Sequence, residues 1–250
     1  MTIRGVLFDI DDTLIDYSAT VRQGILRHLS AEALLDRFTS PDAAVTLWRE
    51  LEEEEYPRFL AGELTFTGQQ QVRTRRFLAH IGAAVDDPRA WFGRYVAFRD
   101  TAWAVFPDVP PMLGALTGRV ALGVVSNSSL AHQVGKLHAV GLHDHFGDAI
   151  LCSAEFGTAK PDPGIFLAGC EMLGLPPDQV AYVGDRHDTD GLGARDAGLR
   201  AFWLDRLASG ARYDGVSVIH SLAELDTVIN AGPGNADGPR GAKPRTGHRT

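Results

Sequence analysis

The chain has few cysteines, a short N-terminal apolar run and no excess of basic residues. Its two cysteines, Cys152 and Cys170, do not have the spacing of metal ligands, and they fit the buried thiols of a reducing compartment. The apolar run near the N-terminus stops at Asp9, which makes it too short for a signal peptide or a membrane-spanning helix. A net charge of −8 argues against binding to nucleic acid or to anionic membranes. We therefore expect a cytoplasmic protein that binds neither.

The composition is otherwise that of a globular protein. About 44% of the 250 residues are hydrophobic and 22% are charged, which is enough to build a sizeable core. The length fits one large domain, or a core with a smaller insertion. Residues 232–250 are rich in glycine, proline and polar side chains, so we expect a disordered C-terminal tail there.

The most informative local feature is a pair of aspartates, Asp9 and Asp11, at the end of an apolar run. Such a run predicts a buried parallel strand over residues 3–9, whose carboxyl end is where open α/β sheets bind ligands. Alternate residues of a strand face the same side, so both carboxylates should point into one site. Two close carboxylates repel each other unless something relieves the charge. The pair indicates either a bound metal or a division between an acid and a nucleophile.

A long helical stretch follows, over residues 17–105, with no convincing strand inside it. Two helices are expected to begin at Pro41 and Pro88, each after a capping residue, and a third spans residues 69–81. The four consecutive glutamates at residues 52–55 are expected on a solvated helix face. An insertion of about 90 residues is far longer than a crossover helix needs. It predicts a separate helical module above the carboxyl edge of the sheet.

From residue 106 onward, predicted strands and helices alternate. Strands are expected at residues 120–125, 149–152, 180–183, 200–204 and 216–219, and helices at 130–140, 164–173 and 185–197. Ser221 and Glu224 form a capping box that opens a final helix. This alternation predicts an α/β fold with a mostly parallel sheet and right-handed crossovers.

Polar residues follow several of these strands. Ser126 and Asn127 follow the strand at 120–125, Lys160 precedes Pro161 in a loop, and Asp185 follows the strand at 180–183. Each has an ordinary alternative, since such residues also make turns, helix caps or exposed surface. Together with the first aspartates they lie in order along one sheet edge, which indicates a single site.

These motifs resemble those of the haloacid dehalogenase superfamily, in particular its phosphatases with a helical cap inserted after the first motif. The matching segments are Asp9-Ile10-Asp11-Asp12-Thr13, Ser126-Asn127, Lys160-Pro161 and Gly184-Asp185 with the further aspartates Asp188 and Asp190. The resemblance covers about residues 3–230. It implies a three-layer Rossmann-like core of residues 1–16 and 106–231, with a helical cap over residues 17–105.

The resemblance also implies catalytic roles. Asp9 would be the nucleophile that forms an aspartyl-phosphate, and Asp11 would be the general acid and then the general base. Mg²⁺ would be held by Asp9, by the backbone carbonyl of Asp11 and by Asp185, because oxygen ligands suit this hard cation.

The remaining roles concern the phosphate group. Ser126 and the backbone amide of Asn127 would bind phosphate oxygens, and Lys160 would offset the negative charge. Asp190, and less clearly Asp188, would order the metal's water ligands, and Thr13 would support the first loop. Arg186 and His187 depart from the usual pattern without affecting these assignments.

The expected activity is hydrolysis of a small phosphomonoester, such as a sugar phosphate, phosphoglycolate or a nucleoside monophosphate, by a monomer or homodimer. An acid at Asp11 favours phosphoryl transfer, because a halide leaving group needs no proton. A phosphomutase of the same family is the main alternative. A phosphonate hydrolase is disfavoured, since residues 17–105 contain no lysine for a Schiff base. A non-catalytic binding module is disfavoured because both Asp9 and Asp11 are present.

Overall fold

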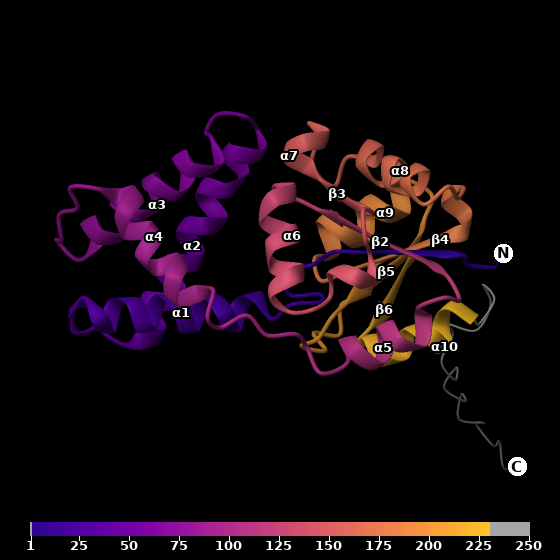
Figure 1. Ribbon diagram of the computed structural model, residues 1–250, viewed down its shortest axis with the longest axis horizontal. Coiled ribbons are helices and arrows are strands. Elements are labelled where there is room, and N and C mark those ends of the chain that lie inside the picture. The colour runs from indigo at the N-terminus through magenta and orange to yellow at the C-terminus, as the bar shows by residue number, and fades with distance from the viewer. Residues whose placement is uncertain (1, 231–250) are drawn as a thin grey trace, which may run out of the picture.

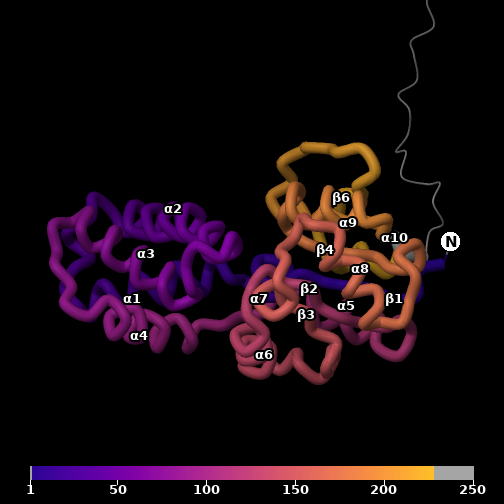
Figure 2. Tube along the Cα trace, turned by 90° about the horizontal axis from the view of Figure 1, so that it is seen from above, coloured from indigo at the N-terminus to yellow at the C-terminus, as the bar shows by residue number. Residues whose placement is uncertain are grey.

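The computed structural model describes residues 2–230, so the tail expected over residues 232–250 lies outside the described part. Figure 1 shows a twisted sheet flanked by helices, with a further group of helices standing together on one side of it. Figure 2 shows the same division from above, with the helical group joined to the sheet by two connecting segments. No helix within residues 2–230 is long and apolar enough to cross a membrane.

The sheet has six parallel strands in the order β3-β2-β1-β4-β5-β6. The strands are β1 (Gly5–Phe8), β2 (Ala121–Ser126), β3 (Ile150–Cys152), β4 (Val180–Gly184), β5 (Arg200–Leu204) and β6 (Val216–Ile219). The predicted α/β class and Rossmann-like parallel sheet are therefore confirmed. The strand order reverses between β1 and β4, and such a reversal opens a crevice at the carboxyl ends of the strands.

Helices cover both faces of the sheet (Figure 1). They are α5 (Val109–Leu116), α6 (Leu130–Ala139), α7 (Ser153–Phe156), α8 (Pro163–Met172), α9 (Gly193–Asp196) and α10 (Leu225–Asn230). Short 3-10 turns lie at Leu35–Arg37, His143–His145, Pro177–Gln179 and Leu222–Glu224. The helix α5 was not predicted from the sequence. Pro110 and Pro111 occupy its first turn, where a missing N–H costs little.

Alternate residues of the strands feed two apolar cores. Phe8 and Val124 pack on one face with residues such as Leu113 and Leu137, and Leu7 packs on the other with Phe166 and its neighbours. Burial of these side chains is the main stabilising term for the layers. Both cysteines are buried and unpaired, as predicted.

Four helices form the group beside the sheet, which we call the cap. They are α1 (Tyr17–Ala31), α2 (Pro41–Leu60), α3 (Phe66–His80) and α4 (Pro88–Arg99), and they share a separate apolar core around Trp48. The starts of α2 and α4 agree with the prediction, since Ser40 and Asp87 accept hydrogen bonds from the first turns. The helix α3 begins at Phe66, three residues before the predicted start, because Thr65 supplies the cap.

The prediction of a solvated glutamate run was wrong for two of its four members. Glu53 and Glu54 are exposed, whereas Glu55 is buried and pairs with Arg58 and Arg76. Glu52 points toward the sheet side of the cap and pairs with arginines there. Helical periodicity explains the split, since four consecutive residues cannot all face solvent on a packed helix.

The two segments that join cap and core lie against each other. Ile15 pairs with Val105 in an antiparallel bridge, the Asp16 amide donates to the Ala104 carbonyl at 2.9 Å, and the Phe106 amide donates to the Leu14 carbonyl at 3.2 Å. These hydrogen bonds fix the entry and exit of the cap beside the loop that follows β1.

A close contact between two helices of the cap gives a test of its packing. A Cβ atom added at Gly24 of α1 would lie 2.7 Å from the Cα of Arg99 in α4, so Gly24→Ala must push the two helices apart. We expect a loss of about 1–3 kcal/mol in the free energy of unfolding, measured by denaturant titration.

The matched control is Gly93→Ala in α4, where an added Cβ meets no atom within 4 Å. It should be neutral or stabilising, by up to ~1 kcal/mol, through helix propensity alone. Equal effects of the two substitutions would contradict the packing described here.

Candidate active site

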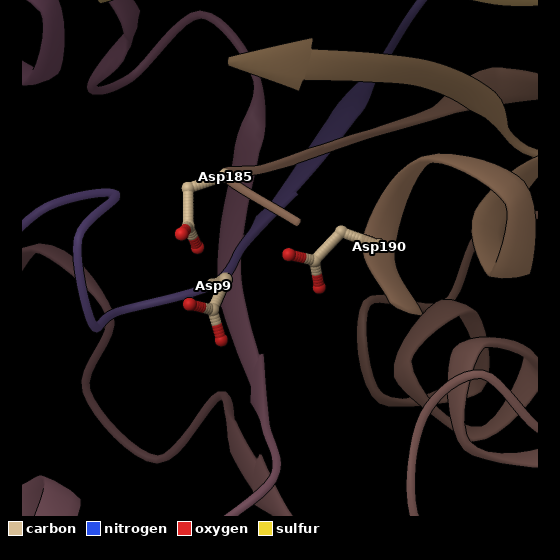
Figure 3. A group of neighbouring side chains, drawn as sticks. All are labelled: Asp9, Asp185 and Asp190. Carbon is tan, nitrogen blue, oxygen red and sulfur yellow. The ribbon is translucent and has the colours of Figure 1, made fainter. Parts of the chain in front are cut away.

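Three aspartates meet at the point where the strand order reverses. Asp9 directly follows β1, Asp185 directly follows β4, and Asp190 lies in a π-helical turn at His187–Leu192. One carboxylate oxygen from each lies within 4.8 Å of the others. Figure 3 shows the three side chains turned toward a common space. Residues almost 180 positions apart are thus brought together by the pairing of β1 with β4.

The turn that carries Asp190 differs from the single helix predicted over residues 185–197. The structure has the π-helical turn first and α9 after it. The Arg186 amide donates to Asp190 Oδ2 at 3.0 Å, and a Cβ on Gly184 would overlap the Asp190 side chain. Glycine at this position therefore lets the carboxylate pack against the end of β4.

Lys160 is the cation of this cluster. Its buried Nζ donates to Asp9 Oδ1 at 2.7 Å, to Asp190 Oδ1 at 2.7 Å and to the Tyr182 hydroxyl at 2.8 Å. The Tyr182 hydroxyl donates in turn to the Val125 carbonyl at 3.0 Å. All three donor directions of the ammonium are therefore used, which fixes it against both acids.

One lysine does not balance three carboxylates. Burial raises the pKa of Asp9 to about 7, even though the charge of Lys160 acts in the opposite direction. Burial, reinforced by the charges of Asp190 and Asp9, raises the pKa of Asp185 well above its usual range. The excess of negative charge on hard oxygen donors fits a divalent cation such as Mg²⁺. Asp9, Asp185 and Asp190 are the carboxylates that could hold such an ion.

Asp11 occupies a different part of the site. The strand β1 ends at Phe8, so Asp11 lies beyond it, where it forms an isolated bridge with Ile15 and still lines the same cavity as Asp9. Its carboxylate accepts from Lys136 Nζ at 2.6 and 2.7 Å and from Gln133 Nε2 at 3.1 Å. Burial opposes ionisation of Asp11, but the charge and hydrogen bonds of Lys136 outweigh it and lower the pKa of this carboxyl.

Lys136 and Gln133 were missed by the sequence analysis. They lie three residues apart on α6, so they present side chains on one face of the helix that follows Ser126. Both are buried. They lie in the first two turns of the helix that follows Ser126 and Asn127. Polar residues at helical spacing there could have indicated them, since buried polar side chains need a partner.

Ser126 and Asn127 lie where β2 meets α6. The Ser126 hydroxyl accepts from Gln133 Nε2 at 2.9 Å. The Asn127 side chain bonds the backbone of Lys160 in both directions, at 2.7 and 2.9 Å. The Asn127 carbonyl accepts from the hydroxyl of Tyr56, a cap residue, at 2.8 Å. The side chain of Asn127 therefore positions the lysine loop, a contact that its motif alone did not predict.

The supporting residues lie at different distances from the acids. Thr13 is buried, and its carbonyl accepts from Arg206 Nη2 at 2.9 Å. Arg186 and Asp188 are exposed, and both line the cavity described next. His187 stacks on the ring of Tyr213, with centroids 4.5 Å apart.

A cavity of about 520 Å³ lies between the core and the cap. Its core side includes Asp9, Asp11, Ser126, Lys160 and Asp185. Its cap side includes Tyr17, Arg49, Glu52, Tyr56, Gln69, Arg73 and Arg99. This volume suits a small-molecule ligand. All the site residues that the sequence predicted on the core line one cavity, except Thr13 and His187.

Comparison with known proteins agrees with this arrangement. A family model described as haloacid dehalogenase-like hydrolase matches residues 3–198. The chain belongs to this family of hydrolases. It is 33% identical over 201 residues to a glyceraldehyde 3-phosphate phosphatase of Methanopyrus kandleri, which covers 79% of this chain and 82% of the relative. It is 30% identical over 223 residues to a phosphoserine phosphatase of Thermus thermophilus, and the match covers 80% of this chain and 88% of the relative.

Solved structures show the same fold at lower identity. The HAD-hydrolase YfnB from Bacillus subtilis, solved bound to magnesium, superimposes with a TM-score of 0.79 at 21% identity, over 92% of this chain and all of YfnB. The L-2-haloacid dehalogenase of Xanthobacter autotrophicus superimposes with a TM-score of 0.74 at 20% identity, over 92% and 99%. The resemblance to the family stated from the motifs is therefore confirmed.

The raised pKa of Asp9 predicts a pH dependence for metal binding. A cation binds the ionised carboxylate, so it competes with the proton that Asp9 holds below about pH 7. Mg²⁺ affinity should fall as the pH is lowered through 7, by up to about tenfold per pH unit for one displaced proton. Calorimetric titration with Mg²⁺ at pH 6, 7 and 8 measures this.

Asp185→Asn should abolish the Mg²⁺-induced rise in Tm without lowering the Tm of the metal-free protein, because it removes one of three repelling charges. Asp178→Asn, at an exposed position, is the matched control and should leave both values unchanged. For the pH prediction above, a Mg²⁺ affinity that does not vary between pH 6 and 8 would contradict the role of Asp9 in binding the ion.

Proposed function

We propose that this protein is a Mg²⁺-dependent phosphatase that hydrolyses a small-molecule phosphomonoester through an aspartyl-phosphate on Asp9. The observation that carries the proposal is the Asp9 carboxylate, held at 2.7 Å by Lys160 beside two further acids and at the base of a cavity. The relatives supply independent support, since they are named as phosphatases of glyceraldehyde 3-phosphate, phosphoserine and, in the rat, N-acylneuraminate 9-phosphate.

Phosphate binding falls to groups at the carboxyl ends of β1 and β2. The Ser126 hydroxyl lines the cavity with Asp9 and can donate to a phosphate oxygen, while the positive charge of the Lys160 ammonium offsets the charge of the phosphate. The amide of Asn127 adds a donor near the start of α6. A bound Mg²⁺ would supply electrostatic stabilisation of the charge on the phosphoryl group.

The first step is attack by Asp9 on phosphorus. Within residues 2–230 only Oδ1 of Asp9 is engaged in a side-chain hydrogen bond, so Oδ2 is the oxygen available to form the bond. As the P–O bond to the alcohol breaks, the leaving oxygen takes a proton from Asp11. Covalent capture on a carboxylate divides one difficult displacement into two easier ones.

The second step returns the enzyme to its starting state. Asp11 accepts a proton from a water molecule, the water oxygen attacks phosphorus, and the bond to Asp9 breaks to release inorganic phosphate. Lys136 favours the ionised, basic form of Asp11 that this step needs. Arrival of an anionic phosphate nearby favours the protonated form that the first step needs.

An acid at Asp11 also separates this proposal from dehalogenation. Several proteins that share the fold are named as haloacid dehalogenases, at 18–26% identity to this chain. A halide leaves without a proton, whereas an alkoxide requires one. Asp11 lines the cavity together with Asp9, so its carboxyl group is placed to protonate a leaving oxygen there.

Replacement of the nucleophile tests the proposal directly. Asp9→Asn should lower kcat for p-nitrophenyl phosphate in the presence of Mg²⁺ by about a thousandfold or more, because no phosphoenzyme can form. Release of p-nitrophenol is the measurement, and Asp178→Asn is the matched control. Activity that survives Asp9→Asn, or that is unaffected by a chelator, would refute the mechanism.

Replacement of the acid should depend on the leaving group. Asp11→Asn should reduce kcat/KM much more for an alkyl phosphate than for p-nitrophenyl phosphate, since the aryl oxide leaves without protonation. We expect a difference of about tenfold or more between the two esters, within the range that general acid catalysis supplies. Equal losses for both esters would show that Asp11 does not protonate the leaving oxygen.

A further inference from the structure

The cap side of the cavity carries three arginines from three different helices. Arg49 is on α2, Arg73 is on α3, and Arg99 is the last residue of α4. Arg73 and Arg99 are only 2% and 6% exposed. A buried guanidinium is costly unless a negative group pairs with it. The partners of these arginines therefore indicate what the cavity binds.

Glu52 is the most buried acidic residue on this side, and several groups share it. Its carboxylate accepts from Arg49 at 2.9 Å, from Arg73 at 2.8 Å and from the Tyr17 hydroxyl at 2.6 Å. The other nearby acids are more exposed: Asp12 lies 4.0 Å from Arg49, Asp100 pairs with Arg99, and Glu53 is on the surface. Exposed acids are screened by water and offset buried charge poorly. The cap side thus holds more buried positive than negative charge.

Two polar groups on α3 are left without hydrogen bonds. Gln69 and Arg73 lie one turn apart, both line the cavity, and both are at least 98% buried. Within residues 2–230, Gln69 Oε1 and Arg73 Nε have no hydrogen-bond partner. Buried polar atoms are normally paired, so the unpaired Arg73 Nε–H points to a ligand that supplies an acceptor, and the unpaired Gln69 oxygen points to one that supplies a donor such as a hydroxyl.

Aromatic rings hold two of these arginines in place. The guanidinium of Arg73 lies 4.5 Å from the ring centroid of Trp48, and that of Arg99 lies 5.0 Å from the centroid of Trp103. Such stacking fixes the plane of a guanidinium, which favours paired hydrogen bonds to a carboxylate or phosphate. These groups are preorganised rather than mobile surface chains.

The arginines lie on the leaving-group side of the cavity. Lys136, which binds Asp11, stands 4.8 Å from the ring centroid of Tyr17, and the hydroxyl of Tyr17 reaches Glu52. A continuous series of contacts thus runs from the proposed acid, Asp11, to the partner of Arg73. A phosphate on Asp9 would place its alcohol portion along this series.

We propose that Arg73, together with Arg99, binds an anionic oxygen group on the alcohol portion of the substrate. The preferred substrates are then phosphomonoesters that carry a carboxylate or a second phosphate. This inference rests on the proposed phosphatase activity and adds the class of leaving group to it.

Two matched pairs of esters test the inference. 3-Phosphoglycerate and glycerol 3-phosphate share a carbon skeleton and differ by a carboxylate in place of a hydroxymethyl group. Fructose 1,6-bisphosphate and fructose 6-phosphate differ by the second phosphate. In each pair we call the ester with the charged alcohol portion the anionic ester and the other the neutral ester. The wild-type enzyme should show kcat/KM at least about tenfold higher for the anionic ester of one or both pairs, as expected for a charge-assisted hydrogen bond. The pair that shows the preference identifies the anion.

The variants show whether Arg73 is responsible. Arg73→Gln should raise KM for the preferred anionic ester by about tenfold or more. It should reduce the wild-type preference for the ester with the charged alcohol portion to about twofold or less, and Arg73→Lys should restore part of that preference. Arg75→Gln, the same change at an exposed position of α3, is the matched control and should alter neither ester. A melting curve for each variant shows that it is folded.

Three results distinguish the possible failures. Equal wild-type kcat/KM for both members of both pairs would overturn the inference. Equal losses for anionic and neutral esters in Arg73→Gln would also overturn it, because they would assign Arg73 a structural role in the cap. Absence of hydrolysis of every ester, p-nitrophenyl phosphate included, would instead overturn the proposed function on which the inference rests.

Discussion

The arrangement of the site depends on one buried ammonium group. Lys160 bridges Asp9 and Asp190 at 2.7 Å each, and without it three largely buried carboxylates would face one another with no positive side chain between them. The lysine is itself fixed on two sides, by the Tyr182 hydroxyl and by the side chain of Asn127 against its backbone. Tyr182 of β4 and Asn127, directly after β2, thus both fix Lys160, which lies in neither strand.

The position of this cluster follows from the sheet. Because all six strands are parallel and their order reverses beside β1, their carboxyl ends open into one crevice. The cluster is left with excess negative charge, and the cap opposite carries buried arginines. The cavity is therefore charged at both ends, negatively at the core end and positively at the cap end. That division suits a ligand with a phosphate at one end and a second recognised group at the other.

Much of the site could be predicted from the sequence because its residues stand in fixed relation to strands. Asp9, Ser126 and Asp185 each follow a buried apolar run, and a strand end is readable from composition alone. Lys136 and Gln133 could not be found in this way, since their role depends on which face of α6 meets the turn after β1. The same limit explains Glu52, expected in solvent but paired with two arginines inside the cap.

The sequence by itself determined the α/β class, the sites of the strands, the helical nature of the insertion and the residue types at the carboxyl edge. These depend on local patterns of burial and capping, which are written in neighbouring residues. Only the tertiary structure decided that Asp190 joins Asp9 and Asp185, that Asp11 pairs with Lys136, and that arginines of three cap helices face the acids. Such pairings are set by how distant elements pack, and no local pattern specifies that geometry.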